Sequence, residues 1–430
     1  MNKVDDKTIS ELNEIISRMI IKDQTPDDFK KIFDLSHNKG GKTNFCSLNG
    51  RDVYLSISSE DCSKLREIIQ NLIKNNRDMR NNISDKMVYE RLLELFDTIK
   101  SEGRKITSKD IQKKCDELLK SLSTTEFTVF HKIYGVDIKS ESPINRGIFT
   151  FYSINKHRKD IDSIINNDGN EQSGIKFLID EFEKHDAWVS VSFQMKEDCT
   201  KAKERARKYL LYLEYILRFF LYPKQSVFDI GIFDLKKSNV EEIYLLSENQ
   251  FSYELNRTSG AVGNIKLDYV FDKNEKYLSK LIELISKDDK TEMEDRILRF
   301  TYLGGMAISE LDHSMGFLKC MMAIEALLQV NKEEISNQIS ENVSFILYGT
   351  GKETVAENRI QMYNIMKKLY SKRSELAHGS KVEIPLNDYN TAIYIIQLLI
   401  RIFLDNDIYY EMKKIDELEK YIQKLKFTVS

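Results

Sequence analysis

The last third of the sequence constrains the fold most strongly, because its apolar residues recur only at helical spacing. This periodicity predicts helices over residues 274–287, 292–312, 315–330, 333–348, 354–378, 388–408 and 410–425. The separators between these helices are short, such as Asn331-Lys332 and Gly349-Thr350-Gly351. Short connections between amphipathic helices are typical of antiparallel neighbours in a bundle. The sequence therefore predicts an all-α helical bundle over residues 274–430.

Two further domains are expected before this bundle. Residues 1–122 show helical periodicity interrupted by a β-hairpin over 44–58, where Asn49-Gly50 lies between two strand-like runs. Residues 123–273 mix strand-like and helical runs, which is typical of an α+β domain, and we interpret them as a candidate sensor or regulatory domain. The predicted fold class is α+β overall and mainly helical, with a mixed α+β middle region and the C-terminal all-α bundle.

Composition excludes several classes of protein. The 65 Lys and Arg residues are balanced by 68 Asp and Glu residues, and a net charge of −3 excludes a basic coat for nucleic acid over the whole surface. The five cysteines are scattered without a Cys-x-x-Cys pair, so neither a disulfide framework nor a zinc finger is expected. The longest apolar stretch is shorter than the roughly 20 residues of a membrane span, and the N-terminus lacks a signal peptide's apolar core. We therefore expect a cytoplasmic protein without a membrane partner.

Three other features do not form a recognisable site. Asn38 to Thr43 ends like a phosphate-binding loop, but Ser36 stands where the first glycine of that loop must be. The histidines before the last one have no metal-ligand spacing, so the sequence predicts no metal site and no cofactor. Residues 201–208 carry five basic side chains, which we interpret as a solvated helix end, with a second RNA-contact face as the alternative.

The strongest candidate for chemistry lies in the segment from Leu369 to Gly379, which contains Arg373 and, after four residues, His378. An arginine near a helix end followed by a histidine is common by chance, so the surroundings decide its interpretation. From residue 359 to 381 the chain has six basic residues and one acidic residue, a local excess that suits a polyanion. We expect RNA contacts from four lysines of this patch, namely Lys367, Lys368, Lys372 and Lys381.

Helix geometry bears on how this pair could act. Five residues advance about 7.5 Å along a helix and rotate by about 140°, so Arg373 and His378 do not lie side by side on a regular helix. Gly379 is expected to end the helix in the left-handed conformation, which places His378 in the last turn. One chain alone makes a poor site with this spacing. Two chains paired across this helix face both residues onto one phosphate, so a homodimer is expected.

Three segments give the C-terminal third its resemblance to a known family: Phe317–Leu328, Ile339–Leu347 and Tyr370–Gly379. They make it similar to a HEPN domain, specifically of the Apea-like branch, whereas residues 1–290 carry no resemblance. The resemblance implies a helical bundle that dimerises and cleaves RNA without metal. It also implies that Arg373 and His378 match the Arg-x4–6-His motif, which both protomers contribute to a composite site. The family commonly has Asn, Asp or His directly after the arginine, whereas this sequence has Ser374, as the Apea-like branch often does.

Metal-free cleavage of RNA uses the 2′-hydroxyl of the substrate as the nucleophile and leaves a 2′,3′-cyclic phosphate and a 5′-hydroxyl. His378 is expected to transfer protons, because a histidine titrates at about 6.5, close to working pH. Arg373 is expected to clamp the scissile phosphate and to stabilise its growing charge. Supporting roles are expected for Ser374, Glu375 and Glu325, the last of which is either a partner of the catalytic residues or a boundary residue of the core. Tyr370 is expected to pack in the core.

The sequence thus predicts a metal-independent endoribonuclease that cuts host or phage RNA, with tRNA as a plausible substrate. The resemblance implies bacterial defence against phage by abortive infection, with a phage-derived trigger as a possible partner. Because an unrestrained ribonuclease harms its host, we expect the N-terminal region to regulate it. Two alternatives stay open: a non-catalytic HEPN module that binds RNA or serves as a dimerisation scaffold, and a toxin held by a separately encoded antitoxin.

Overall fold

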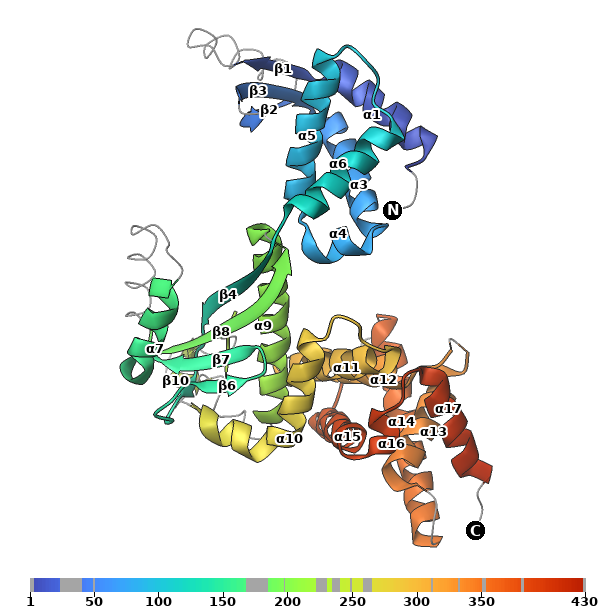
Figure 1. Cartoon of the computed structure of the whole chain (residues 1–430). Helices are drawn as coiled ribbons and strands as arrows, with labels where there is room; N and C mark the ends of the chain where they lie inside the picture. The colour runs from blue at the N-terminus through green and yellow to red at the C-terminus, as the bar shows by residue number, and fades with distance from the viewer. Residues whose placement is uncertain are drawn as a thin grey trace. The chain divides into compact units, whose positions relative to one another are not determined.

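The computed structural model shows a mainly helical α+β chain, which confirms the predicted fold class (Figure 1). It describes residues 4–23, 41–48, 51–167, 185–196, 198–221, 230–233, 240–247, 250–257, 265–310, 312–331, 333–349, 353–379 and 383–427. The chain forms two compact units, and the predicted division into three domains stays a prediction. The first unit comprises Met1–Phe127 with Phe193–Ala206, and the second comprises Thr128–Ser192 with Arg207–Ser430.

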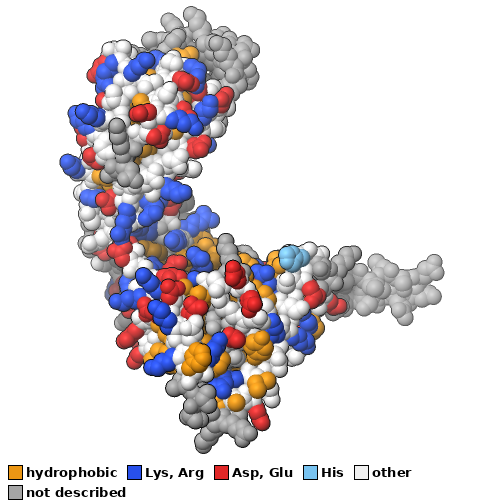
Figure 2. Space-filling model, turned by 90° about the vertical axis from the view of Figure 1, so that its right-hand side faces the viewer, with side chains coloured by type: hydrophobic (Ala, Val, Ile, Leu, Met, Phe, Trp, Pro, Cys, Tyr) orange, Lys and Arg blue, Asp and Glu red, His pale blue; other side chains and the backbone are white. Residues whose placement is uncertain are grey.

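The surface carries charges of both signs. On the face drawn in Figure 2, acidic and basic side chains are interspersed, as the near-zero net charge predicts. Among the described helices, none combines the length and the apolar character needed to cross a membrane.

The first unit combines a helical layer with a small antiparallel sheet. Its helices are α1 (Asp6–Arg18), α3 (Ser59–Lys74), α4 (Arg77–Asn82), α5 (Asp85–Ser101) and α6 (Ser108–Ser121). Its strands are β1 (Ile20–Asp23), β2 (Gly41–Leu48) and β3 (Arg51–Ser58), in the order β1-β3-β2. Leu48 of β2 pairs with Arg51 of β3 in an antiparallel register, which confirms the predicted hairpin. Its expected turn, Asn49-Gly50, lies outside the described residues.

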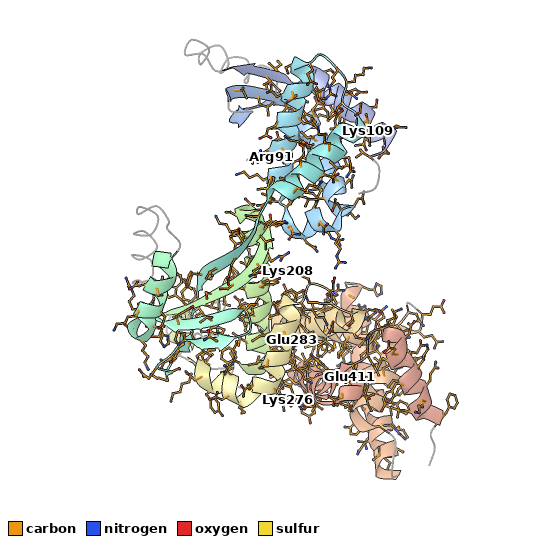
Figure 3. The ribbon with its side chains drawn as sticks, viewed as in Figure 1. Arg91, Lys109, Lys208, Lys276, Glu283 and Glu411 are labelled. Carbon is orange, nitrogen blue, oxygen red and sulfur yellow. The ribbon has the colours of Figure 1, made fainter. Side chains whose placement is uncertain are left out.

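Amphipathic helices build the core of the first unit. Leu12 and Ile15 of α1 are buried together with Leu92 and Phe96 of α5. Each such side chain contributes about 1.5–3 kcal/mol when it leaves water. The opposite faces are polar: Arg91 on α5 and Lys109 on α6, labelled in Figure 3, lie exposed on the surface.

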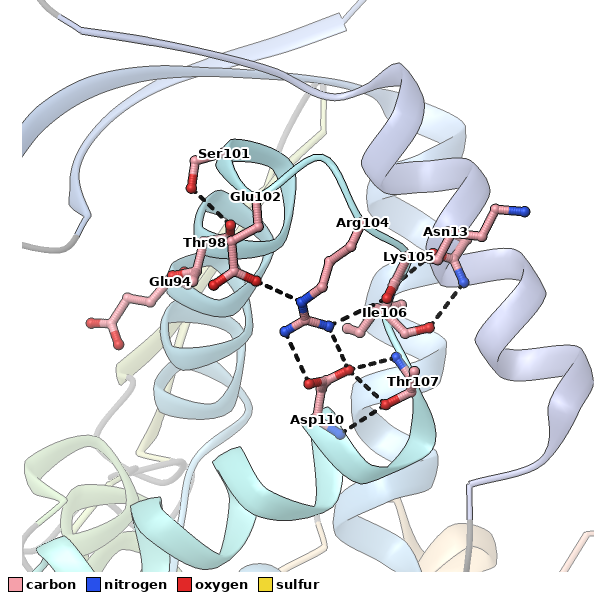
Figure 4. Close-up of polar contacts among 10 residues, drawn as sticks. All are labelled: Asn13, Glu94, Thr98, Ser101, Glu102, Arg104, Lys105, Ile106, Thr107 and Asp110. Carbon is pink, nitrogen blue, oxygen red and sulfur yellow. Dashed lines mark hydrogen bonds and ion pairs between the residues drawn. The ribbon is translucent and has the colours of Figure 1, made fainter.

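A charged cap begins α6 (Figure 4). Thr107 is the N-cap residue, and its hydroxyl accepts from the backbone N–H of Asp110 while the Asp110 side chain accepts from the backbone N–H of Thr107. The guanidinium of Arg104 donates to both carboxylate oxygens of Asp110, at 3.0 and 3.1 Å. The Arg104 hydrogen bond is the largest cause that lowers the pKa of Asp110 to about 2, and the Thr107 hydrogen bonds act in the same direction. Asn13 of α1 also binds the backbone of Ile106, so this cap joins α1 to α6.

We expect Asp110→Asn to lower the free energy of unfolding of the first unit by about 1 kcal/mol at neutral pH, the usual value of a lost helix cap. Because the folded pKa of Asp110 lies below its usual 3.8, its stabilisation is present above pH 3.8 and is lost as the pH falls through about 2. Denaturant unfolding of parent and variant checks this, with Glu117→Gln on the exposed face of the same helix as the control. A difference that stayed constant from pH 6 down to about 2 would contradict the assignment.

The second unit begins with a four-stranded sheet in the order β4-β8-β7-β6. The strands of this part of the chain are β4 (Thr124–Lys132), β5 (Val136–Asp137), β6 (Ile144–Arg146), β7 (Phe149–Ser153), β8 (Ala187–Lys196), β9 (Val240–Ser247), β10 (Gln250–Arg257) and β11 (Ile265–Lys266). Strands β9 and β10 form an antiparallel pair, and β11 pairs in parallel with β5. The helices among them are α7 (Ile154–Asn167) and α9 (Cys199–Leu221).

A buried ion pair on α9 fixes a short neighbouring segment. Glu214 and Arg218 lie one turn apart with 2.9 Å between Oε1 and Nη1, and both side chains are 1% exposed. The second oxygen of Glu214 accepts from the backbone N–H groups of Ile232 and Phe233, while Arg218 donates to the carbonyl oxygen of Ile230. Because buried charges must be paired and hydrogen-bonded, we interpret this network as structural.

The rest of the second unit is helical: the described residues from 267 to 427 contain no strand. Its helices are α10 (Leu267–Ser286), α11 (Glu292–Ile308), α12 (His313–Leu328), α13 (Ile335–Tyr348), α14 (Glu353–Ala377), α15 (Leu386–Asp405), α16 (Asp407–Tyr410) and α17 (Ile415–Phe427). The helix predicted over 388–408 ends earlier, because Asn406 adopts an extended backbone and its side chain caps α16 at the N–H of Ile408.

Side chains of α10 contact the end of α15 and the short helix α16. Lys276 forms an ion pair with Asp405 at 2.6 Å, and the hydroxyl of Tyr277 donates to the same carboxylate at 2.7 Å. The ammonium of Lys280 lies 3.9 Å from the ring centre of Tyr410. Two polar contacts to the end of α15 and one cation–π contact to α16 therefore hold α10 in place.

Helices α9 and α11 approach each other closely at two glycines. A Cβ atom on Gly305 would lie 2.0 Å from the carbonyl oxygen of Tyr215, and one on Gly304 would lie 2.5 Å from the ring of Phe219. Atoms at these distances overlap, so only glycine fits at both positions. The contact brings α9 of the sheet region directly onto the helical region within the second unit.

We expect Gly305→Ala to destabilise the second unit by about 3 kcal/mol or more, because the clash is with backbone, which cannot rotate away. Thermal and denaturant unfolding measure the loss. Arg299→Ala is the control, since this exposed residue on the same helix should change stability by less than about 0.5 kcal/mol. Equal stability of the two variants would show that the helices do not approach as described.

Candidate functional site

The predicted catalytic segment lies at the C-terminal end of α14. The helix ends at Ala377, and His378 follows it directly. Gly379 has a φ of +78°, which confirms the expected left-handed end of the helix. The N–H groups of His378 and Gly379 donate to the carbonyl oxygens of Ser374 and Leu376, so the last turn closes on itself.

Arg373 is held by Glu325 of α12. Nη2 of Arg373 donates to Oε2 of Glu325 at 2.9 Å, and Nε lies 2.8 Å from Oε1. This second contact is an ion contact without hydrogen-bond alignment, so Nε and Oε1 are buried without a hydrogen-bond partner among the described residues. The side chains are 24% and 14% exposed, respectively. The pair joins α12 to α14 at the border between core and solvent, and it makes Glu325 a partner of Arg373.

Tyr370 completes this cluster from one turn earlier on α14. Its side chain is buried, as the sequence predicts, and the guanidinium carbon of Arg373 lies 5.6 Å from its ring centre. Burial is the largest cause that raises the pKa of Tyr370 to about 12, and the charge of Glu325 and a hydrogen bond to it add to the effect. Tyr370 therefore stays protonated at neutral pH and is a hydrogen-bond donor to Glu325.

Arg373 keeps hydrogen-bond donors that the protein does not use. A guanidinium has five N–H donors, of which Nη2 donates to Glu325 while Nε makes only the ion contact. Nη1 makes no hydrogen bond with any described residue. An arginine that is fixed at one edge and unpaired at the other can receive a phosphate oxygen without losing its internal partner.

His378 does not meet Arg373 in a single chain. The His378 side chain is exposed, and neither a hydrogen bond nor a ring contact joins it to the described residues. Ser374 is half-buried, and its backbone carbonyl oxygen accepts a hydrogen bond from the backbone N–H of His378. Glu375 is exposed and accepts from the hydroxyl of Ser371 at 3.1 Å. The structure thus places Glu325 beside Arg373. The catalytic roles of Arg373 and His378, and the supporting roles of Ser374, Glu375 and Glu325, stay predictions.

Two of the four lysines predicted to bind RNA have partners within the chain. Lys367 donates to the amide oxygen of Asn337 at 2.5 Å, and Lys372 forms an ion pair with Asp388 of α15. Lys368 is exposed, and Lys381 lies outside the described residues. The sequence did not predict Asn337 and Asp388 as partners of these lysines, because nothing in their spacing links them to α14.

Comparisons with protein-family models, with curated proteins and with solved structures find no match to this chain. Among the described residues, no group of three or more His, Cys, Asp and Glu side chains is arranged to hold a metal ion.

We expect Glu325→Gln and Arg373→Gln each to lower the free energy of unfolding by about 1–3 kcal/mol, because each leaves a partly buried charge without its partner. The double variant should lose less than the sum of the two, since no unpaired charge is left. Denaturant unfolding of all four proteins gives the coupling energy. Glu375→Gln is the control on the exposed face of α14, and strict additivity of the two single variants would argue against the pair.

Proposed function

We propose that this protein is a metal-independent endoribonuclease of the HEPN type. The observation that carries the proposal is the arrangement at the end of α14, where Arg373 is fixed by Glu325 with Nη1 unpaired and the exposed His378 follows the helix. This arrangement supplies a cation for a phosphate and a proton-transfer group at working pH. The HEPN-like segments of the sequence support the same conclusion. Host or phage RNA, including tRNA, is the proposed substrate, and defence against phage by abortive infection is the proposed role.

The proposed reaction needs no group from outside the protein and the RNA. His378 takes the proton from a ribose 2′-hydroxyl, and the resulting oxygen attacks the adjacent phosphorus. The bond from phosphorus to the 5′-oxygen breaks, and that oxygen takes the proton back from the protonated His378 to become a 5′-hydroxyl. Nη1 of Arg373 binds a non-bridging oxygen and stabilises the charge that it gains in the transition state.

The proposed site is completed by a second copy of the chain. Within one chain the guanidinium of Arg373 is bound to Glu325, while His378 stands apart beyond the helix end. Pairing two copies across α14 would let four side chains, two from each protomer, face one phosphate. Regulation by the N-terminal region belongs to the same proposal, because an active nuclease must be restrained in its host.

A non-catalytic role is the second candidate, and one observation favours it. Lys367, Lys372 and Arg373 all have protein partners, so much of the basic patch stabilises the fold. A HEPN-like module that binds RNA weakly or serves as a scaffold would need no more than this. A toxin held by a separate antitoxin is the remaining alternative, and tolerance of the gene expressed alone would argue against it.

The test is cleavage of total tRNA by the full chain in the presence of a chelator. We expect Arg373→Ala and His378→Ala each to lower the cleavage rate by about 100-fold or more, as the loss of an acid–base or charge-stabilising group does. The products should carry 2′,3′-cyclic phosphate ends. Glu357→Gln, an exposed residue near the start of α14, is the matched control and should cleave like the parent.

Two outcomes would overturn the proposal. Cleavage that both substitutions leave unchanged would place the nuclease activity elsewhere or in a contaminant. Salt-sensitive RNA binding without cleavage, retained after loss of both residues, would favour the non-catalytic module.

A further inference from the structure

A second arginine is held at the end of α12 in a way similar to Arg373. Arg296 of α11 donates from Nη1 to the backbone carbonyl oxygens of Ala326 and Gln329, at 3.1 and 3.0 Å. Its Nε donates to a carboxylate oxygen of Glu292, one turn earlier on α11, at 3.0 Å. Because three acceptors hold it at two nitrogens, the guanidinium of Arg296 has a fixed orientation.

The third nitrogen of this guanidinium has no partner among the described residues. Nη2 of Arg296 makes no hydrogen bond with any of them, and the side chain is 21% exposed. Nη2 is also absent from the described atoms that are both buried and unpaired, so it reaches solvent. An arginine whose orientation is set in advance loses little conformational freedom when its remaining N–H groups bind a phosphate oxygen.

The positive charge of Arg296 is only partly neutralised. Its two carbonyl partners carry no net charge, and its acidic partner, Glu292, also accepts from the backbone N–H of Ile415 at 3.4 Å. Glu292 is the first residue of α11, where the helix end carries a positive partial charge of its own. The carboxylate is therefore shared among three positive groups, and Arg296 keeps a positive potential toward solvent at Nη2.

Arg296 and Arg373 bind neighbouring residues of α12. Arg373 binds the side chain of Glu325, and Arg296 binds the backbone of Ala326, the next residue. Both α12 residues are half-buried, so this turn lies at the surface. Two immobilised guanidiniums, one from α11 and one from α14, therefore lie beside one turn of α12, and each has a nitrogen without a partner among the described residues.

We propose that Nη2 of Arg296 binds a second phosphate of the RNA strand whose scissile phosphate lies at Arg373. The inference rests on the proposed function and adds the class of substrate, which is a strand that continues past the cut and not a single nucleotide. Because a strand carries a phosphate at every nucleotide, one that is bound at Arg373 brings a nearby phosphate to the next cation. The strand then crosses the last turn of α12.

A purely structural role for Arg296 would use the same protein contacts, because Nη1 satisfies carbonyl oxygens at the end of α12. The two roles differ in what Nη2 does. A structural arginine adds nothing to the salt dependence of RNA binding, whereas each phosphate contact on a single strand adds about 0.7 to the slope of log K against log salt. The salt dependence therefore separates phosphate binding from a loss of stability.

The experiment is fluorescence anisotropy of the full chain with a labelled 2′-O-methyl oligonucleotide of about 12 nucleotides. This probe has phosphates but no 2′-hydroxyl, so it binds without being cut. The dissociation constant is measured from about 50 to 200 mM salt. We expect Arg296→Gln to weaken binding by about tenfold at the lowest salt and to lower the slope by about 0.7. Arg296→Lys keeps the charge and should restore most of the slope.

Arg299 provides the matched control. It lies one turn later on α11, is 62% exposed and forms an ion pair with Asp295 at 3.4 Å. Arg299→Gln removes a charge of the same kind from the same helix and should keep the slope of the parent. Circular dichroism confirms that each variant is folded.

A second measurement needs no variant and decides the question if Arg296→Gln does not fold. Phenylglyoxal modifies accessible guanidiniums, and peptide mass spectrometry locates the modified arginines. The oligonucleotide should protect Arg296 of the parent protein, whereas Arg299 should react equally with and without it.

Four results would each overturn the inference. The parent does not bind the oligonucleotide at about 50 mM salt, where phosphate contacts are strongest. Folded Arg296→Gln keeps the slope of the parent. Arg299→Gln lowers the slope as much as Arg296→Gln does, which would indicate a diffuse charge and not a phosphate contact. The oligonucleotide leaves the modification of Arg296 unchanged.

The inference and the proposed nuclease fail separately. Cleavage of tRNA together with a salt slope that does not depend on Arg296 would keep the nuclease and remove the inference. Binding that depends on Arg296, without any cleavage of tRNA, would remove the nuclease and keep Arg296 as a phosphate-binding residue.

Discussion

A charge can be kept at the edge of a helical core only if an opposite charge lies beside it, and the proposed site depends on this constraint. Arg373 and Glu325 satisfy it for each other across α12 and α14. Tyr370 is buried beside this pair, and burial raises its pKa to about 12, with the charge of Glu325 adding to the effect. One edge of the guanidinium is thereby fixed, and the orientation of its remaining donors follows from the packing of the two helices.

Helix α14 carries two regions of opposite chemistry. Near its C-terminal end, Arg373 and His378 offer a cation and a titratable group, which suit a phosphate. Two to three turns earlier, Tyr363 lines a cavity to which four glutamates contribute. The lysines between them hold the bundle together, since Lys367 and Lys372 bind Asn337 and Asp388. The basic patch of the sequence is therefore in large part a set of structural contacts.

Much of the local structure could be predicted from the sequence because it depends on near neighbours. Helical periodicity placed α14 to within about one residue at each end, and Gly379 ends it in the left-handed conformation as expected. The hairpin of β2 and β3 follows from alternation on either side of Asn49-Gly50. The predicted helix over 388–408 runs past the break at Asn406, although Asp405-Asn406-Asp407 interrupts the apolar residues there and asparagine is a common N-cap residue.

The sequence by itself determined a mainly helical α+β chain, a balanced surface charge and a basic segment that ends at a histidine and a glycine. These depend on composition and on spacings of a few residues, which the chain fixes before it folds. Only the tertiary structure decided that Glu325 holds Arg373, that two lysines of the patch are already paired, and that glutamates of α13, α17 and the segment before α13 surround one cavity. Such contacts join residues far apart in the sequence, and they form only when packing removes apolar surface from water and brings their helices together.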